Sequence, residues 1–372
     1  MKLEMVPVIY GNETVGLGHL VSINILATAS ANGLFEDVPH IVICKKKTLQ
    51  QFNYLVKILS KNLCFVGLDE YKYEQVIERY KERLYSFEYF YPNEKLKDDS
   101  EKPLYGSAWN RSLEYLHKNK IQIFDDIYSN TPSLSDIIPE IFKKDEPIAV
   151  ISVRTTICDV GKRNSNPKVL QLTINELKRR GYKIVRIGAN FSKEILNGID
   201  LDLSRRWSTG IELSVMKSAN ILIGSLGGIT QLAGLLGVKT LLYDCPVPIQ
   251  IYLFHNYLNH HILFKNPNNS IWPKGLSPYE YFALLDSEYT FLGIKSKESF
   301  INDNSSSGNE FTLSPNTDKQ ILNAVQYILS EENTTECIED RPRRDFKRCV
   351  EANTGLYSSF NRLLPEDIYK ER

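Results

Sequence analysis

The sequence predicts an α/β protein with parallel sheets and helices on both sheet faces. Residues 221–244 read as a buried strand, a glycine-rich loop, a short helix ending at Gly237, and a second buried strand. Residues 148–187 also read as strand, helix and strand, with Gly181 ending a helix over 169–180. The apolar runs of these strands are continuous, as expected when both faces are covered. Strands that alternate with helices indicate a doubly wound parallel sheet.

The first third of the chain repeats this order of elements. Apolar runs and helical spacing predict strand, helix, strand, helix and strand at residues 6–10, 20–31, 41–44, 49–60 and 65–67. A last helix is expected over residues 317–329. The chain should therefore hold two α/β halves of similar construction.

A domain joint is expected at residues 143–147, which are charged and end in proline. We therefore expect a Rossmann-like domain over 1–146 and a second over 147–330, with a ligand cleft between them. The charged tail over 331–372 contains apolar side chains and should pack back on the body.

Composition excludes several classes of protein. The 372 residues carry 45 basic and 45 acidic side chains, and this balance argues against a broad nucleic-acid-binding surface. No apolar run has the length of a membrane span, and the N-terminus lacks a signal-peptide pattern. The six cysteines have no CxxC spacing, which is typical of free thiols in a reducing compartment. We expect a cytoplasmic protein, with peripheral contact at the inner face of the cytoplasmic membrane left open.

The loop at residues 224–230 is the first candidate binding site. It follows a strand and precedes a helix, where free backbone N–H groups and the helix dipole favour an anion such as phosphate. Gly227 and Gly228 would let a ligand approach the backbone closely, and Ser225 and Thr230 add hydroxyl groups. The alternative is a tight turn that binds nothing. The loop lacks the Gly-x-Gly-x-x-Gly pattern, which weakens an oxidoreductase interpretation.

The second candidate lies after the first strand, where Gly16, Gly18 and His19 precede a helix. The glycines permit close approach, and a histidine there can act as a general base on a sugar hydroxyl. The alternative is a histidine that caps or packs the helix. Glu212 or Asp159 would be the next base to test.

Basic residues at strand ends form the third candidate. Arg154 ends the strand over 148–153 and can bind a pyrophosphate through two N–H groups. Arg163 and Asn164 follow in a polar loop that suits substrate contact. Salt bridges and a solvated loop are the alternatives.

Arg186 and Gly188 stand at the end of the next strand. Arg186 lies inside the strand pattern, so a structural role and ligand binding are both open.

No spaced set of ligands predicts a metal site. Asp125 and Asp126 are a lone acidic pair, and His260 and His261 lack a third ligand at suitable spacing. We therefore expect no metal ion and no cofactor.

Together these motifs resemble those of GT-B glycosyltransferases. More narrowly, they are similar to a family of bacterial surface-polysaccharide glycosyltransferases distantly related to the fucosyltransferases. Ser152 stands where the fucosyltransferase-like form has histidine. The resemblance is best over 148–330. It is carried by Gly-His at 18–19, Ile-Ser-Val-Arg at 151–154, Arg-Asn at 163–164, Gly-Tyr-Lys-Ile-Val-Arg-Ile-Gly at 181–188, the glycine-rich loop at 223–228, Trp-Pro-Lys at 272–274 and Asn-Thr at 316–317.

The resemblance implies a nucleotide-diphosphate sugar held mainly by the second domain, with Arg154 and the loop at Ser225 on its phosphates. The acceptor would be a glycan or a lipid-linked saccharide. A deprotonated acceptor hydroxyl would attack the anomeric carbon, while Arg154 and helix-end amides stabilise the leaving nucleotide diphosphate. The rival interpretations are a nucleotide-sugar epimerase or hydrolase of the same fold, and a non-catalytic binding module.

Overall fold

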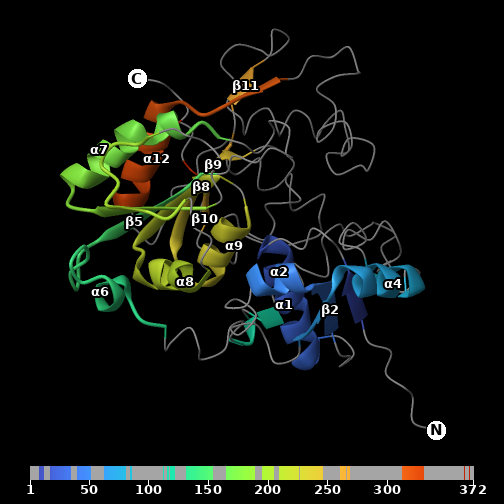
Figure 1. The fold of residues 1–372 in the computed structure, drawn as a ribbon. Helices are drawn as coiled ribbons and strands as arrows, with labels where there is room; N and C mark the ends of the chain where they lie inside the picture. Colours follow the sequence, from blue (N-terminus) through green and yellow to red (C-terminus); the bar gives the residue numbers. More distant parts are fainter. Residues whose placement is uncertain are drawn as a thin grey trace. The chain divides into compact units, whose positions relative to one another are not determined.

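A computed structural model of the chain divides into two compact units (Figure 1). The first comprises Met1–Ile137 with Trp207–Ser218, and the second comprises Ile138–Arg206 with Ala219–Arg372. Each unit holds a parallel sheet of its own. The structure describes residues 8–11, 17–34, 40–51, 63–80, 84–85, 112, 115–116, 118–121, 131–153, 165–188, 195–204, 209–225, 227–245, 260–264, 266–268, 312–330, 364 and 368.

The first unit contains a four-stranded parallel sheet in the order β3-β2-β1-β4. The chain runs outward from β1 to β3 and then returns to β4 on the other side of β1, so the strand order reverses between β1 and β4. The strands are β1 (Val8–Gly11), β2 (His40–Lys45), β3 (Leu63–Leu68) and β4 (Leu84–Tyr85). The helices of this unit are α1 (Leu17–Ala31), α2 (Lys46–Gln51), α4 (Glu70–Tyr80), α6 (Leu134–Ile137) and α8 (Thr209–Ser218).

Helix α1 is buried around its whole circumference over residues 23–30. Such a helix must be apolar or internally satisfied, and the Thr28 hydroxyl indeed donates to the Asn24 carbonyl at 2.7 Å. The helix ends at Ala31, and Gly33 follows it with a φ of 91°, the left-handed conformation typical just after a helix. Residues 23–30 therefore form part of the core of the first unit.

The second unit contains a six-stranded parallel sheet in the order β10-β9-β8-β5-β6-β7. The chain runs from β5 out to β7, returns to β8 on the other side of β5, and continues to β10. This topology confirms the doubly wound parallel sheet expected from the sequence. The strands are β5 (Ile148–Ser152), β6 (Lys183–Ile187), β7 (Leu201–Asp202), β8 (Ile221–Ser225), β9 (Lys239–Cys245) and β10 (His260–Phe264). A separate antiparallel pair joins β11 (Asn266–Asn268) to β12 (Thr312–Ser314).

Both faces of this second sheet are buried. Helices α7 (Gln171–Arg179) and α12 (Asp318–Ser330) lie side by side (Figure 1). They cover a row of apolar side chains that are in register across the strands: Ile151, Ile223 and Leu241. The residues next to these in each strand point to the opposite face and are also fully buried, among them Val150, Leu222 and Leu242. Burial on both faces explains why the strand sequences are continuously apolar.

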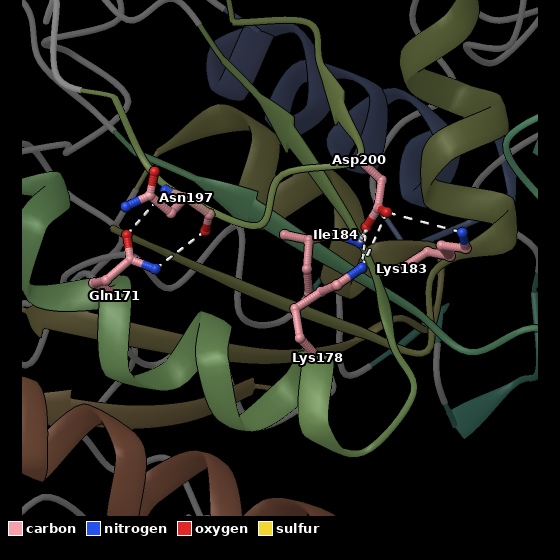
Figure 2. A network of polar contacts seen from close by, with 6 residues as sticks. All are labelled: Gln171, Lys178, Lys183, Ile184, Asn197 and Asp200. Carbon is pink, nitrogen blue, oxygen red and sulfur yellow. Dashed lines mark hydrogen bonds and ion pairs between the residues drawn. The ribbon is translucent and has the colours of Figure 1, made fainter.

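The segment that leads to β7 is fastened along α7 (Figure 2). The Gln171 side chain accepts the Asn197 N–H at 3.0 Å and donates to the Asn197 carbonyl at 3.1 Å. Two turns further along the helix, Lys178 Nζ contacts both carboxylate oxygens of Asp200 at 3.0 and 2.9 Å. Asp200 also accepts the N–H of Ile184 at 2.7 Å. These contacts bring β7, only two residues long, to the edge of the sheet, where a short strand limits pairing with other chains.

Helix boundaries differ from expectation at several places. The helix expected over 169–180 begins as the 3₁₀ turn η2 (Pro167–Leu170), because the Asn166 side chain accepts the Lys168 N–H and starts the turn earlier. Its predicted end is confirmed, since Gly181 has a φ of 85°. The predicted start at residue 49 is wrong, because α2 begins directly after β2 at Lys46. Residues 52–62 lie outside the described part.

Candidate functional site

The candidate site lies where the strand order of the second sheet reverses, between β5 and β8. After β5 the chain passes to α7 on one face. After β8 it passes to α9 (Gly228–Leu235), whose Thr230 methyl lies against Gly224 on the other face. Ser152 and Gly224 are in register at these two strand ends. In open α/β sheets, ligands bind outside the carboxyl ends of the strands at such a reversal.

Three small residues meet at the ends of β5, β6 and β8. Ser152 lies between Gly224 and Gly188, the residue that follows β6. A Cβ atom on Gly224 would lie 2.8 Å from the Ser152 carbonyl oxygen, and one on Gly188 would lie 3.4 Å from Ser152 Oγ. Gly188 also has a φ of 102°, which favours glycine. The structure thus brings Gly188 next to Ser152 and packs Ser152 and Gly224 tightly against each other.

The loop after β8 leads directly into α9. Gly227 is extended (φ −173°, ψ 175°) and occupies the N-cap position of the helix. This position usually holds Asp, Asn, Ser or Thr, whose side-chain oxygen accepts a first-turn N–H. Glycine has no such oxygen, so the position is open to an anionic oxygen supplied by a ligand. Ser225 is buried at the end of β8, and Gly228 is the first helical residue, three residues before the expected start.

The Thr230 side chain is directed at the loop itself. It is 1% exposed, accepts the N–H of Gly227 at 3.0 Å and donates to the Gly227 carbonyl at 2.8 Å. The sequence had suggested a hydroxyl for the ligand. The observed bonds use that hydroxyl to shape the loop instead.

Arg186 lies on the face of the sheet covered by α7 and α12, because it is in register with Ile151. It is 3% exposed, and its Nη1 is 3.6 Å from the Asp202 carboxylate of β7. The Arg186 side chain is thus buried on the face opposite to α9, with the more exposed Asp202 beside it, and this placement favours the structural role among the two that the sequence left open.

Tyr243 of β9 is buried on the same face. Burial raises the pKa of Tyr243, and the negative charge of Asp244 raises it further. The Ser165 hydroxyl and the positive charge of Arg186 oppose this shift, although Ser165 lies outside hydrogen-bonding geometry with the Tyr243 hydroxyl. Tyr243 is therefore neutral in the folded protein.

The backbone conformation of Asp244 and its contact with Asn316 were not predicted from the sequence. The Asp244 φ of 53° is rare for a residue other than glycine, although Asp and Asn adopt it most readily. The Asp244 N–H donates to Asn316 Oδ1, and the Asn316 N–H donates to Asp244 Oδ1, both at 2.6 Å. Thr317 and Gln320 then form a capping box that starts α12. The Asn-Thr pair at 316–317 was the only sign of this contact in the sequence. No local pattern marks its partner, Asp244 in β9.

The first sheet has a comparable reversal between β1 and β4. Helix α1 starts at Leu17, three residues earlier than expected, so Gly18 and His19 lie in its first turn just past the carboxyl end of β1. The other predicted site residues lie outside the described part and stay predictions: Gly16, Arg154, Arg163 and Asn164. The same holds for Asp125, Asp126, Asp159 and residues 272–274.

The described residues contain no group of three or more His, Cys, Asp or Glu side chains placed to hold a metal ion. Among the helices described, none is long and apolar enough to cross a membrane.

Glu212 in α8 should make stability depend on pH. Burial raises the pKa of this carboxyl from 4.5 to about 7. Its stabilising contribution is therefore complete below pH 4.5 and is lost as the pH rises through 7, where the folded state must hold a buried charge. We expect Glu212→Gln to stabilise the protein at pH 8 by up to about 3 kcal/mol and to change little at pH 4.

Urea unfolding at both pH values measures this difference. The exposed Glu140 provides the control, because Glu140→Gln should leave stability nearly unchanged at either pH. An equal effect of Glu212→Gln at pH 4 and pH 8 would contradict the prediction.

Comparison with known proteins identifies the fold. A search of the sequence finds no matching protein family and no matching curated protein. The structure matches that of a glycosyl transferase family 9 protein from Veillonella parvula DSM 2008, with a TM-score of 0.53 and 11% identity over 89% of this chain and 99% of that one. At this identity the match shows the fold alone, and it confirms the α/β GT-B fold expected from the sequence.

Two further solved structures are similar at a lower level. One is ADP-heptose LPS heptosyltransferase II from E. coli, with a TM-score of 0.44 and 10% identity over 79% of this chain and 100% of that one. The other is the iron-containing dodecameric glycosyltransferase TibC from enterotoxigenic E. coli H10407, with a TM-score of 0.39 and 14% identity over 66% of this chain and 61% of that one.

Proposed function

We propose that this protein is a glycosyltransferase that moves a sugar from a nucleotide-diphosphate sugar to a hydroxyl group of a glycan or lipid-linked acceptor. The observation that carries the proposal is the amino end of α9, with glycine at its N-cap, at the strand reversal of the second sheet. First-turn N–H groups have no acceptor within a helix, and the dipole there favours negative charge. A diphosphate supplies the matching oxygens.

On the donor side, Arg154 complements the helix amides. It follows Val153 directly after β5, the strand paired with β8. In the proposed reaction its guanidinium and the α9 amides share the charge that develops on the leaving nucleotide diphosphate. Gly188 stands beside Ser152 at the neighbouring strand end, where a ligand of this kind would lie. Arg163 and Asn164 would contact the donor from the loop that follows.

On the acceptor side, the proposed general base is His19. It stands in the first turn of α1, at the strand reversal of the first sheet. The base takes the proton of the acceptor hydroxyl as this oxygen attacks the anomeric carbon and the bond to the diphosphate breaks. A helix amino end disfavours a cation, which suits a base that must start neutral.

The residue at position 152 distinguishes this chain from the fucosyltransferase-like group. That group has histidine at the position of Ser152, and here the side chain lies between Gly188 and Gly224. The donor sugar and nucleotide are therefore to be determined by experiment.

A ligand screen followed by a transfer assay tests the proposal. ADP, GDP, UDP, CMP and dTDP, alone and as sugar conjugates, are tested for a rise in melting temperature, because a ligand that binds only the folded state stabilises it. The sugar-labelled donor is then supplied with and without an acceptor. Label recovered on the acceptor supports the proposal. Label in water indicates a hydrolase, binding without turnover indicates a binding module, and absence of any binding overturns the proposal.

Turnover should survive removal of metal ions. Arg154 and the α9 amides provide positive charge at the phosphates, which is the task a divalent cation performs in metal-dependent transferases. The rate before and after dialysis against EDTA should therefore agree. A loss in EDTA that manganese or magnesium restores would contradict this expectation and direct attention to Asp125 and Asp126. Because TibC is iron-containing, iron is added back in a parallel sample.

A further inference from the structure

Thr230 has a role that goes beyond the proposed function and rests on it. We infer that Thr230 is a positioning residue, which holds the β8–α9 loop in the shape that binds the donor's phosphates without touching the donor. The inference comes from four contacts of one buried side chain.

The first two contacts fix the conformation of Gly227. The Thr230 hydroxyl accepts the Gly227 N–H at 3.0 Å and donates to the Gly227 carbonyl at 2.8 Å. One hydroxyl thus holds the peptide groups on both sides of the same residue. The Gly227 N–H is turned inward and is not available to a ligand. The amides of Gly228 and Ile229, in the first turn of α9, keep the direction of the helix axis.

The other two contacts join the loop to the strand that precedes it. Thr230 Oγ1 lies 3.4 Å from the Ser225 carbonyl, and the Thr230 methyl lies 2.9 Å from the place of a Cβ on Gly224. The side chain therefore contacts the end of β8 and the start of α9 together. Threonine is branched at Cβ and rotates little about χ1, so packing of the methyl also sets the direction of the hydroxyl.

The arrangement is one half of a capping box. In the complete motif the N-cap side chain also binds a first-turn amide, while the side chain at N3 bonds back to the N-cap N–H. Here the N-cap is glycine, so only the backward bond from Thr230 is made. This bond stabilises the loop, and the N-cap places no side-chain oxygen on the first-turn amides. Because Thr230 is 1% exposed, water does not compete for these bonds.

Two substitutions separate the parts of this side chain. Thr230→Val keeps the methyl and the branched shape but loses the hydroxyl, whereas Thr230→Ser keeps the hydroxyl. The ligand is whichever of ADP, GDP and UDP the wild-type protein binds most tightly, and the matching nucleoside without phosphate is the control. Titration should show that Thr230→Val weakens the diphosphate at least about tenfold and leaves the nucleoside unchanged, while Thr230→Ser stays close to wild type.

Hydrogen exchange gives a readout that needs no ligand. The peptide spanning residues 224–232 should exchange faster in Thr230→Val than in wild type, because the Gly227 N–H loses its acceptor. If Thr230→Val does not fold, Thr230→Ala replaces it, since alanine also lacks the hydroxyl and introduces no bulk.

Several results would overturn the inference. One is diphosphate binding by Thr230→Val at wild-type strength. Another is an equal loss for nucleoside and diphosphate, which would show a general structural role. A wild-type protein that binds no nucleotide would remove the proposed function itself, and the two failures are thereby distinguished.

Discussion

Replacing Gly227 by aspartate should lower the affinity for a nucleoside diphosphate at least about 100-fold and at the same time stabilise the folded protein. The extended backbone at this position is open to any residue. An aspartate there would cap α9 with its own carboxylate, which is worth about 1 kcal/mol. The same carboxylate would occupy the place of the phosphate and repel it. Opposite changes in stability and binding are a result that damage to the fold does not produce.

Gly227→Asn is the matched control for this experiment. Asparagine has the same shape and also caps a helix, but it carries no charge. It should keep the gain in stability and lose less affinity than aspartate does. Calorimetric titration gives the affinities, and urea unfolding gives the stabilities. Binding of normal strength by a folded Gly227→Asp protein would show that the loop is only a turn.

Gly224→Ala adds only one methyl group, yet it should markedly lower the free energy of unfolding of the second unit. Its Cβ would lie 2.8 Å from the Ser152 carbonyl oxygen and 2.9 Å from the Thr230 methyl. A backbone oxygen cannot move unless β5 and β8 separate, so we expect a loss of about 1–3 kcal/mol, and more for Gly224→Val. Urea unfolding measures the loss.

Gly67→Ala serves as the control for this substitution. Its Cβ would also meet an atom at 2.8 Å, but that atom is Cδ2 of Leu49, the end of a side chain that can rotate. The cost at Gly67 should therefore be clearly smaller. Equal losses at the two glycines would argue against a rigid contact between β5 and β8.

Local patterns predicted the elements of the second unit well. The run from Ile221 to Tyr243 reads correctly as strand, loop, helix and strand, because continuous apolar residues and glycines mark both strands and both helix ends. The main local error was to assign residues 228–230 to the loop, although α9 begins at Gly228. Glycine is unfavourable inside a helix because it loses more backbone freedom there than any other residue, so the pair Gly227-Gly228 indicates a loop in the sequence.

The site itself was only partly predictable, because its neighbours are distant in sequence. Ser152 and Gly224 are 72 residues apart, and they pair because β8 lies next to β5 in the sheet. No local sequence pattern predicts on which side of β5 the strand β8 is placed. The role of Thr230 was hidden for another reason. A threonine near a glycine-rich loop fits either a ligand or a backbone partner, and only the direction of its side chain decides between them.

The position of α12 in the chain has a consequence for biosynthesis. The described strands of the second sheet are complete at Phe264, yet α12, which supplies Ile321, Ala324 and Ile328 to one face, ends only at Ser330. At about 5–20 residues per second, the ribosome needs several seconds to bridge that interval. During this time the α12 side of the nascent sheet lacks its partner and is a surface that a chaperone can recognise. The hydrogen bonds between Asp244 and Asn316 can form only once Asn316, just before α12, has been synthesised, and they form as α12 completes the core of the unit.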